Sequence, residues 1–369
     1  HQLFTSESVC AGHPDKICDA ISDAILDAAL AQDPNTHAGL ETVAGANKIA
    51  LFGEIKTSAE LNFEKIARGK VAALGYTNPA WGFSAESEFS NDIHLQSPEI
   101  AMGVEGDDGA GDQGMMFGFA CDETPELMPL PIALAHCLTR RIDELRESGE
   151  LAWLRPDGKS QVTVRYDGDK PVAIEKVVIA VAHSQETSAK QVRSETIEKI
   201  IKPILGRYKF DLPSDENITI NGTGLWHIPG PESDAGLTGR KIVVDGYGGY
   251  ARVGGGAFSG KDPSKVDRSG AYAARYIAKN IVAAGLATKC EVGLAYVIGQ
   301  PLPLMQTIET FGTATVPEAD LYAFKDRLLD TSVKGIVETL NLRRPIYSQT
   351  SAYGHFGKAD LPWEQLVKN

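Results

Sequence analysis

Hydrophobic residues recur every three or four positions in several long stretches of this chain, the spacing typical of a helix with one buried face. The first stretch follows Pro14, which suits the first helical position, and ends before Asp33 and Pro34. Further helices are predicted over residues 61–74, 129–148, 189–205, 267–284 and 321–340. We expect the alanine-rich helix over 267–284 to be the strongest, with Asp267 as its N-cap.

Short apolar runs between these stretches predict β-strands. They cover residues 39–43, 49–55, 161–166, 173–182, 241–245 and 292–298. Residues 97–114 have no periodicity and are rich in Gly and Asp, which is typical of a loop or linker. Helices and strands mix throughout in units of about 110 residues, so we expect three α/β or α+β domains.

The composition is that of an ordinary globular protein, with 43% hydrophobic and 23% charged residues. The net charge of −13 argues against nucleic acid as the main partner. No apolar run approaches the roughly 20 residues of a membrane span, and no signal peptide is visible. Five scattered cysteines without a C-x-x-C pair indicate reduced thiols. We therefore expect a cytoplasmic protein that binds neither membranes nor nucleic acid.

The most informative motif is a glycine-rich stretch over residues 254–268. Four glycines within seven residues allow backbone N–H groups to converge on an anion. Three cations and two carboxylates accompany them: Lys261, Lys265, Arg268, Asp262 and Asp267. Carboxylates of this kind hold Mg²⁺ beside phosphates. The stretch therefore suits a polyphosphate, with a flexible surface loop as the alternative.

The same stretch almost matches a P-loop. Gly255 to Lys261 fits the pattern G-x-x-x-x-G-K, but Asp262 stands where a Ser or Thr hydroxyl should bind Mg²⁺. A P-loop-like nucleotide hydrolase is the alternative function that this match suggests. Such an enzyme would make ADP.

The segment GHPDK (12–16) opens the first predicted helix. His13 can donate a hydrogen bond to a phosphate or shuttle a proton, and Asp15 can ligate Mg²⁺. A helix cap with a surface histidine is the alternative.

Three further turns bring charged residues together, and each alone could be a plain surface turn. They are GAGDQG (109–114) with Asp112, RPDGKS (155–160) with Asp157 and Lys159, and GLTGRK (236–241) with Arg240 and Lys241 after Asp234.

Taken together, the motifs resemble those of the S-adenosylmethionine synthetase (methionine adenosyltransferase) family over essentially the whole chain. The matching segments are FTSESV (4–9), GHPDK (12–16), GAGDQG (109–114), RPDGKSQV (155–162), GLTGRK (236–241), GGGAFSGKDPSKVDRS (254–269) and YGHFG (353–357). The resemblance implies three similar α/β domains with pseudo-threefold symmetry, each a mixed sheet with helices on one face. We place the domains at residues 1–97, 109–228 and 229–369, with a lid loop over 98–108.

The implied enzyme transfers the adenosyl group of ATP to the sulfur of L-methionine, then hydrolyses the bound triphosphate to pyrophosphate and phosphate. Two Mg²⁺ ions per site and K⁺ are the implied ions. The implied assembly is a homodimer with shared active sites, paired again into a dimer of dimers. An inactive regulatory member of the family is a further alternative, against which the presence of His13, Asp15 and the lysines counts.

The resemblance also implies a role for individual residues. The catalytic set is His13, Lys159, Arg240, Lys241, Lys261, Lys265 and Asp112. The ATP-binding set is His13, Asp157, Lys159, Trp226, Asp234, Arg240, Lys241, Ala257 and Lys261. The methionine-binding set is Glu54, Gln96, Asp112, Asp234 and Lys265. Asp15, Glu7 and Asp267 are the implied Mg²⁺ ligands, and Glu41 is the implied K⁺ ligand.

The chain departs from the family pattern at a few positions. Leu225 and Trp226 stand where Arg-Phe is usual, and Val253 replaces a histidine. Residues 45–47 replace a usual Lys-Thr-Gly, and the lid loop is a few residues shorter than in well-known relatives. Trp226 can still stack on adenine, whereas Leu225 removes a cation. The phosphate and metal positions are intact.

Overall fold

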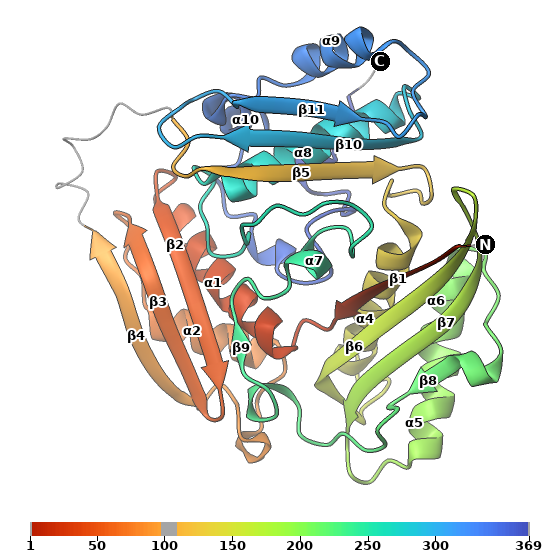
Figure 1. Ribbon diagram of the computed structural model, residues 1–369. Helices are drawn as coiled ribbons and strands as arrows, with labels where there is room; N and C mark the ends of the chain where they lie inside the picture. The colour runs from red at the N-terminus through yellow and green to blue at the C-terminus, as the bar shows by residue number, and fades with distance from the viewer. Residues whose placement is uncertain (1, 97–108, 368–369) are drawn as a thin grey trace.

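The computed structural model describes residues 2–96 and 109–367, with the backbone but not the side chain of Gln96. Three β-sheets stand on different sides of the molecule, and helices cover one face of each (Figure 1). This arrangement confirms the predicted α/β class. No described helix is long and apolar enough to cross a membrane.

The first sheet has the strand order β4-β3-β2-β9. Its strands are β2 (His37–Gly45), β3 (Lys48–Lys56), β4 (Glu88–Gln96) and β9 (Gly236–Leu237). β2 pairs antiparallel with β3, and β4 runs parallel to β3. Helices α1 (Pro14–Leu30) and α2 (Phe63–Ala73) cover one face. Side chains of β2 alternate between the face that the helices cover and the open face, so Leu40 is buried and Glu41 is exposed.

The second sheet has the order β1-β6-β7-β8. Its strands are β1 (Gln2–Val9), β6 (Leu154–Asp167), β7 (Lys170–His183) and β8 (Ile218–Ile220). Only β8 is parallel to its neighbour. Helix α4 (Leu130–Glu147) packs on β1 and β6. A helical run beside α4 joins α5 (Ala189–Thr196), a π-helical turn (Ile197–Ile201) and α6 (Lys202–Arg207).

The third sheet, β11-β10-β5, is antiparallel throughout. Its strands are β5 (Gly114–Cys121), β10 (Lys289–Tyr296) and β11 (Met305–Glu309). Helix α8 (Val266–Ala283) packs along β5 and β10, and α9 (Glu318–Leu328) and α10 (Val333–Thr339) pack on α8. The two other sheets are mixed, as predicted, whereas the prediction of a mixed sheet is wrong for the third.

One strand of each sheet comes from a distant part of the chain. β1, from the predicted N-terminal domain, lies in the second sheet, and β5, from the predicted central domain, lies in the third. β9, from the predicted C-terminal domain, lies in the first sheet beside β2. The three sheets therefore exchange strands in a cycle. Because no sheet is built from one predicted segment alone, the domain limits stay a prediction.

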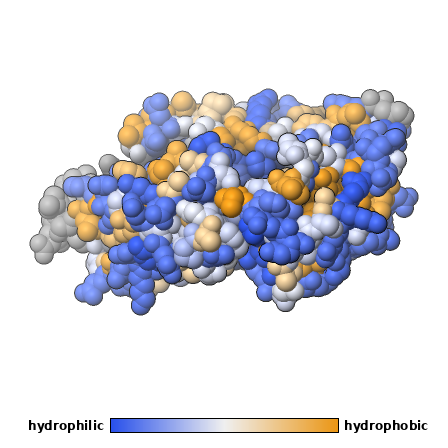
Figure 2. All heavy atoms as spheres, turned by 90° about the horizontal axis from the view of Figure 1, so that it is seen from below, coloured by the Kyte–Doolittle hydropathy of each residue, from blue (hydrophilic) through white to orange (hydrophobic). Residues whose placement is uncertain are grey.

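Each sheet leaves hydrophobic side chains exposed on the face that its helices do not cover. Leu3 of β1, Phe52 of β3 and Met115 of β5 are 55%, 42% and 51% exposed, and their strand positions place them opposite the helix-covered residues. On the surface seen from below, hydrophobic residues are scattered among hydrophilic ones (Figure 2).

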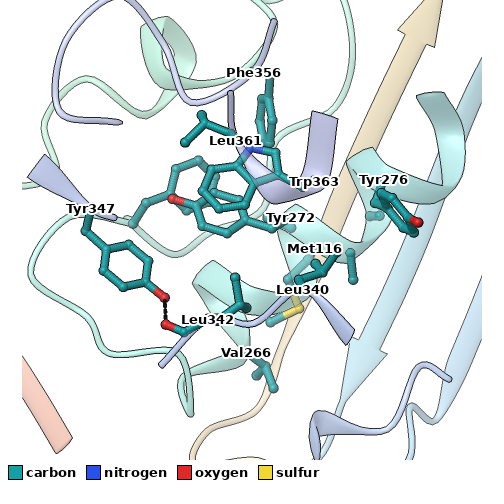
Figure 3. Packing of buried hydrophobic residues seen from close by; sticks show 14 of the residues in the cluster. Met116, Val266, Tyr272, Tyr276, Leu340, Leu342, Tyr347, Phe356, Leu361 and Trp363 are labelled. Carbon is teal, nitrogen blue, oxygen red and sulfur yellow. Dashed lines mark hydrogen bonds between the residues drawn. The ribbon is translucent and has the colours of Figure 1, made fainter. Parts of the chain in front are cut away.

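The first and third sheets share one hydrophobic core with α1, α2 and α8, whereas the second sheet has its own with α4 and α6. In the shared core the rings of Tyr272 and Trp363 stack with their centroids 3.6 Å apart (Figure 3). Nearby, Tyr347 donates its O–H to the carbonyl of Leu342 at 2.6 Å. The buried hydroxyl is thereby satisfied.

Two predicted elements are wrong. Residues 241–245, predicted as a strand, contain the single helical turn α7 (Ile242–Asp245), because a short apolar run does not distinguish the two structures. The helix predicted over 321–340 is two helices, α9 and α10. The break follows from the extended backbone of Leu329 and from Ser332, whose side chain caps α10.

The predicted N-cap of α8 is also wrong. Lys265 holds the cap position, while Asp267 lies in the first turn. Six strands were not predicted: β1, β4, β5, β8, β9 and β11. β1 and β4 carry polar or charged residues at their exposed positions, which weakens the apolar signal.

Gly118 of β5 lies against the backbone of Ala274 and Arg275 in α8, and a Cβ there would overlap those atoms. We expect Gly118→Ala to lower Tm and to cost about 3 kcal/mol of unfolding free energy, because two backbones must separate. Gly206→Ala in α6 is the control, since a Cβ there meets no atom within 4 Å and alanine favours helix. Thermal unfolding measures both variants. Equal Tm values would contradict the close packing of β5 on α8.

Candidate active site

His13 lies at the N-terminus of α1 and caps it, because its Nδ1 accepts a hydrogen bond from the backbone N–H of Asp15 at 3.2 Å. The ring is buried. Burial, together with the charges of Lys241 and Lys159, lowers the pKa of His13 to about 3. The ring is therefore neutral near pH 7, and its proton is on Nε2 because Nδ1 is an acceptor. His13 can donate one hydrogen bond to an anion.

Asp15 ties the same helix end to the turn before α7. Its Oδ1 accepts from the N–H of Leu237 at 3.0 Å, and its Oδ2 accepts from Lys241 Nζ at 2.5 Å. Arg240 Nε lies 3.7 Å from Oδ1. Burial raises the pKa of Asp15, but the hydrogen bonds from Lys241 and Leu237 outweigh burial and hold that pKa below its ordinary value. The carboxylate is therefore ionised.

The second sheet adds two charges on its open face. Lys159 of β6 lies opposite Val9 of β1, and Glu7 lies two positions earlier on β1. Both charged side chains are exposed. Five of the predicted residues thus come together in a group that we call the histidine cluster: His13, Asp15, Lys159, Arg240 and Lys241.

The glycine-rich turn forms a second group, the lysine cluster, made of Lys261, Lys265, Asp262 and Asp267. Lys261 donates to Asp267 Oδ2 at 2.6 Å, and Lys265 donates to Asp262 Oδ2 at 2.7 Å. Burial raises the pKa of Asp262, but the charge of Lys265 outweighs burial and lowers it overall. Asp262 also accepts from the N–H of Ala38 at 2.8 Å, which fixes the turn to β2.

Strands β2 and β3 place two predicted acids beside the lysine cluster. A Cβ at Gly39 would lie 3.1 Å from Glu54 Oε1 and 3.9 Å from Lys265 Cε, so Glu54 and Lys265 flank this glycine. Glu41 lies on the same open face of the sheet. Although much of the Glu41 side chain is exposed, its partial burial raises its pKa, and the charge of Lys261 opposes the rise.

The turn over 109–114 lies next to the lysine cluster. A Cβ at Gly114 would lie 3.3 Å from Asp267 Oδ1, and one at Gly111 would lie 3.8 Å from the carbonyl of Ser264. Asp112 is exposed within this turn.

Gln96 ends β4 opposite Lys56, two positions beyond the residue that pairs with Glu54. The side chain of Gln96 and the predicted lid over 98–108 lie outside the described residues.

A third segment carries the residues predicted to hold the adenosine. Asp157 is buried and accepts from the N–H of Gly230 at 2.9 Å through Oδ2. Burial raises the pKa of Asp157 to about 7. Trp226 is half-buried and donates its Nε1–H to the carbonyl of Ile228 at 2.8 Å. Asp234 is exposed just before β9.

The two clusters are separate within one chain. Ala257 of the glycine-rich turn approaches Gly239, which immediately precedes Arg240, since a Cβ at Gly239 would lie 2.5 Å from that of Ala257. Within residues 2–96 and 109–367, however, no hydrogen bond or ion pair joins a side chain of the histidine cluster to one of the lysine cluster.

Comparison with known proteins covers the whole chain. Models of the N-terminal, central and C-terminal domains of S-adenosylmethionine synthetase match residues 1–98, 107–226 and 228–365. The S-adenosylmethionine synthase of Streptococcus suis is 55% identical over all of this chain and 97% of its own length. That of Treponema denticola is 51% identical over 99% of this chain and 96% of its own length.

The chain belongs to the S-adenosylmethionine synthetase family. A third relative, the S-adenosylmethionine synthase of Streptococcus equi subsp. zooepidemicus, is 54% identical over all of this chain and 95% of its own length. The resemblance inferred from the motifs is thereby confirmed.

S-adenosylmethionine synthetases generally use Mg²⁺ and K⁺, and the acids of this chain fit that use. The described residues contain no group of three or more His, Cys, Asp or Glu side chains placed to bind an ion. Mg²⁺ is usually held by one or two carboxylates together with substrate phosphates. Asp15 and Asp267 meet this condition, because each lies in a cluster of cations that can bind those phosphates.

Sequence analysis missed a column of four aspartates along α1: Asp15, Asp19, Asp23 and Asp27. They recur every four residues and so share one face of the helix. Each accepts backbone N–H groups from a different segment: Asp15 from Leu237, Asp19 from Gly239, Asp23 from Gly260, and Asp27 from Tyr347 and Ser348. The four-residue spacing is visible in the sequence and is the signal that identifies them.

Asp23 is the most strongly bonded member, because Arg268 donates to both of its oxygens at 2.7 and 3.0 Å and both side chains are fully buried. We expect Asp23→Asn to cost about 3–5 kcal/mol of unfolding free energy, since Arg268 keeps its charge without its counter-charge. Asp122→Asn, at an exposed position, is the control and should be neutral. Denaturant unfolding compares the two. A neutral Asp23→Asn would show that the column does not hold the glycine-rich turn.

The neutral state of His13 can be checked by NMR. We expect the His13 imidazole signals to show no titration from pH 8 down to about pH 4, with His13→Asn used for assignment. An unfolded histidine binds its proton near pH 6.5, so the contribution of His13 to stability is present above that pH and falls as the pH drops towards 3. A midpoint near 6.5 in the folded protein would contradict the burial of this ring.

Proposed function

We propose that this chain joins ATP and L-methionine into S-adenosylmethionine. The methionine sulfur attacks C5′ of ATP, the C5′–O bond breaks, and the whole triphosphate leaves. The triphosphate is then hydrolysed to pyrophosphate and phosphate. The observation that carries the proposal is the pair of cation clusters, one of which contains a neutral histidine at a helix N-terminus.

His13 acts by hydrogen bonding rather than by acid–base catalysis. A thioether sulfur has no proton to lose, so the attack on C5′ needs no base. Neutral His13 carries its proton on Nε2, and in the proposed reaction this N–H donates to an oxygen of the leaving triphosphate as its charge develops. The N-terminus of α1 favours the same anion.

The cations stabilise the triphosphate, which carries about four negative charges and needs dense positive charge around it. Lys159, Arg240 and Lys241 supply this charge from the histidine cluster, and Lys261 and Lys265 supply it from the lysine cluster. The presence of five cations supports a triphosphate over a single phosphate, even though three carboxylates share these clusters.

The remaining residues hold the two organic substrates. Trp226 stacks on adenine, and Asp157 and Ala257 line the rest of the ATP site. The carboxylate of Glu54 takes the amino group of methionine. Gln96, Asp112 and Asp234 complete the methionine site.

Asp15, Glu7 and Asp267 would hold two Mg²⁺ ions and Glu41 would hold K⁺. These ions neutralise phosphate charge and so favour departure of the triphosphate. The ionised state of Asp15 supports its role as a ligand.

The proposed assembly is a homodimer whose open sheet faces pack together. Exposed Leu3, Phe52 and Met115 lie on those faces, as do Glu7 and Glu54. Packing two copies face to face would bring the histidine cluster of one subunit to the lysine cluster of the other. A further pairing of dimers and a cytoplasmic location remain inferences from the family.

The geometry counts against a P-loop hydrolase. The N–H of Gly260 donates to Asp23 and is not free for a phosphate. Asp262, at the position of the P-loop hydroxyl, is buried and bonded to Lys265.

The purified protein should make S-adenosylmethionine, pyrophosphate and phosphate in equal amounts from ATP, L-methionine, Mg²⁺ and K⁺. His13→Ala should lower kcat for synthesis about 10²–10³-fold, as expected for loss of one donor to a developing charge. His13→Asn keeps a donor and should retain more activity. Mass spectrometry and phosphate release measure the products. ADP as the main product rejects the proposed reaction, and equal losses in both variants reject hydrogen-bond donation by His13.

Sharing of the site between subunits predicts complementation. His13→Ala and Lys261→Ala homodimers should each be nearly inactive, because each lacks a residue in both sites. Mixed dimers carry one site with both residues intact, so about half of the wild-type activity per mixed dimer should return. Mixing is verified by differently tagged subunits. Mixed dimers without activity would place His13 and Lys261 of one chain in the same site.

A further inference from the structure

A small cavity away from the proposed active site has the features of a second anion site. It lies between α4, the end of α6 and residues 353–358, and has a volume of about 80 Å³. This is several times the space that one water needs. No member of the histidine cluster or the lysine cluster lines it.

Three cations line the cavity: Arg140, Arg207 and Lys358. Within the described part of the chain, none of them forms an ion pair. Arg140 lies over the ring of Tyr353, 5.1 Å from its centroid. Lys358 donates to the carbonyls of Gln349 and Ala352 at 2.7 and 2.6 Å. Burial, followed by the charge of Arg140, lowers the pKa of Lys358 to about 7.

One buried polar atom of a residue that lines the cavity, Oε2 of Glu126, has no hydrogen-bond partner among residues 2–96 and 109–367. The other oxygen of Glu126 accepts from Tyr208 at 3.2 Å. Buried polar atoms without partners are uncommon in folded proteins. Together with the cations, this atom indicates a missing ligand.

We propose that this cavity binds one inorganic phosphate ion in a protonated form. The cations hold its charged oxygens, while Glu126, which can only accept a hydrogen bond when ionised, accepts the P–OH proton. Sulfate has the same shape but no proton near neutral pH, so Glu126 repels it. The small volume favours the free ion over a phosphate ester.

Two hydrogen bonds connect the cavity to the turn that carries His13. Tyr353, which lines the cavity, donates its O–H to Asp143 Oδ2 at 2.6 Å, and the same oxygen accepts from the N–H of Ala11 at 2.9 Å. Phosphate is a product of the proposed reaction, so a role for this site in that reaction rests on the proposed function. The binding of phosphate to the cavity does not depend on the proposed function.

Calorimetric titration of the full protein with inorganic phosphate tests the proposal, with S-adenosylmethionine and pyrophosphate saturating so that the reaction site is filled. Arg140→Gln should weaken binding about tenfold or more, because a charge-assisted hydrogen bond is lost. Arg141→Gln is the matched control, since Arg141 donates to the carbonyl of Lys199 and should leave binding unchanged. Equal affinity in the two variants overturns the site.

The identity of the ion is tested by the same titration with sulfate and with glycerol 3-phosphate. Wild-type protein should prefer phosphate to both. Glu126→Gln should raise the affinity for sulfate relative to phosphate about tenfold or more, because repulsion by the carboxylate is removed. If Glu126→Gln leaves the ratio of sulfate to phosphate affinity unchanged, Glu126 does not recognise the phosphate proton. If glycerol 3-phosphate binds more tightly than phosphate, the ligand is not the free ion. The two proposals can fail separately. If the protein makes no S-adenosylmethionine but still binds phosphate in a way that depends on Arg140, the proposed function is wrong and this site stands.

Discussion

The aspartate column of α1 is the constraint on which both clusters depend. The turns that carry Arg240, Lys241, Lys261 and Lys265 have little regular structure, so their positions come from bonds to this rigid helix. Three of the acids also pair with a buried or half-buried cation: Asp15 with Lys241, Asp19 with Lys16, and Asp23 with Arg268. Each of these buried carboxylates accepts a backbone N–H from a loop and also pairs with a cation. Only one position of the loop satisfies both partners, because leaving the carboxylate or the cation unpaired costs several kcal/mol.

Strand exchange brings the same segments to that helix. β1 is an edge strand of the second sheet and leads directly to the turn of His13, while β9 fixes the start of the turn that carries Arg240 to the first sheet. The histidine cluster is therefore built where two sheets meet. β5 begins at the end of the turn that contains Asp112, beside the lysine cluster. Each exchanged strand thus places one functional segment.

Local patterns in the sequence predict most helices and the charged motifs, but not the contacts between them. The helix after Pro14 follows from its apolar spacing, and the glycine-rich turn follows from its composition. The pair of Asp15 and Lys241 joins positions 226 residues apart, which no periodicity encodes. The aspartate column was missed because charges at helical spacing usually mark a solvated face. Here that face is covered by loops, a tertiary fact that only the structure supplies.

Each cluster holds its cations against its own carboxylates before any substrate binds. Lys241 is bonded to Asp15 and Lys261 to Asp267, and these pairs are only partly buried on the lysine side, with 19% and 24% of those side chains exposed. On the proposed function, an arriving triphosphate offers these lysines a more highly charged partner, and each lysine that turns to it leaves a carboxylate free. The freed carboxylates are the residues proposed to hold Mg²⁺. The ion pairs therefore keep the charged groups ordered, and the exchange of partners couples phosphate binding to metal binding, because each lysine that turns to the phosphate frees a carboxylate for the metal ion.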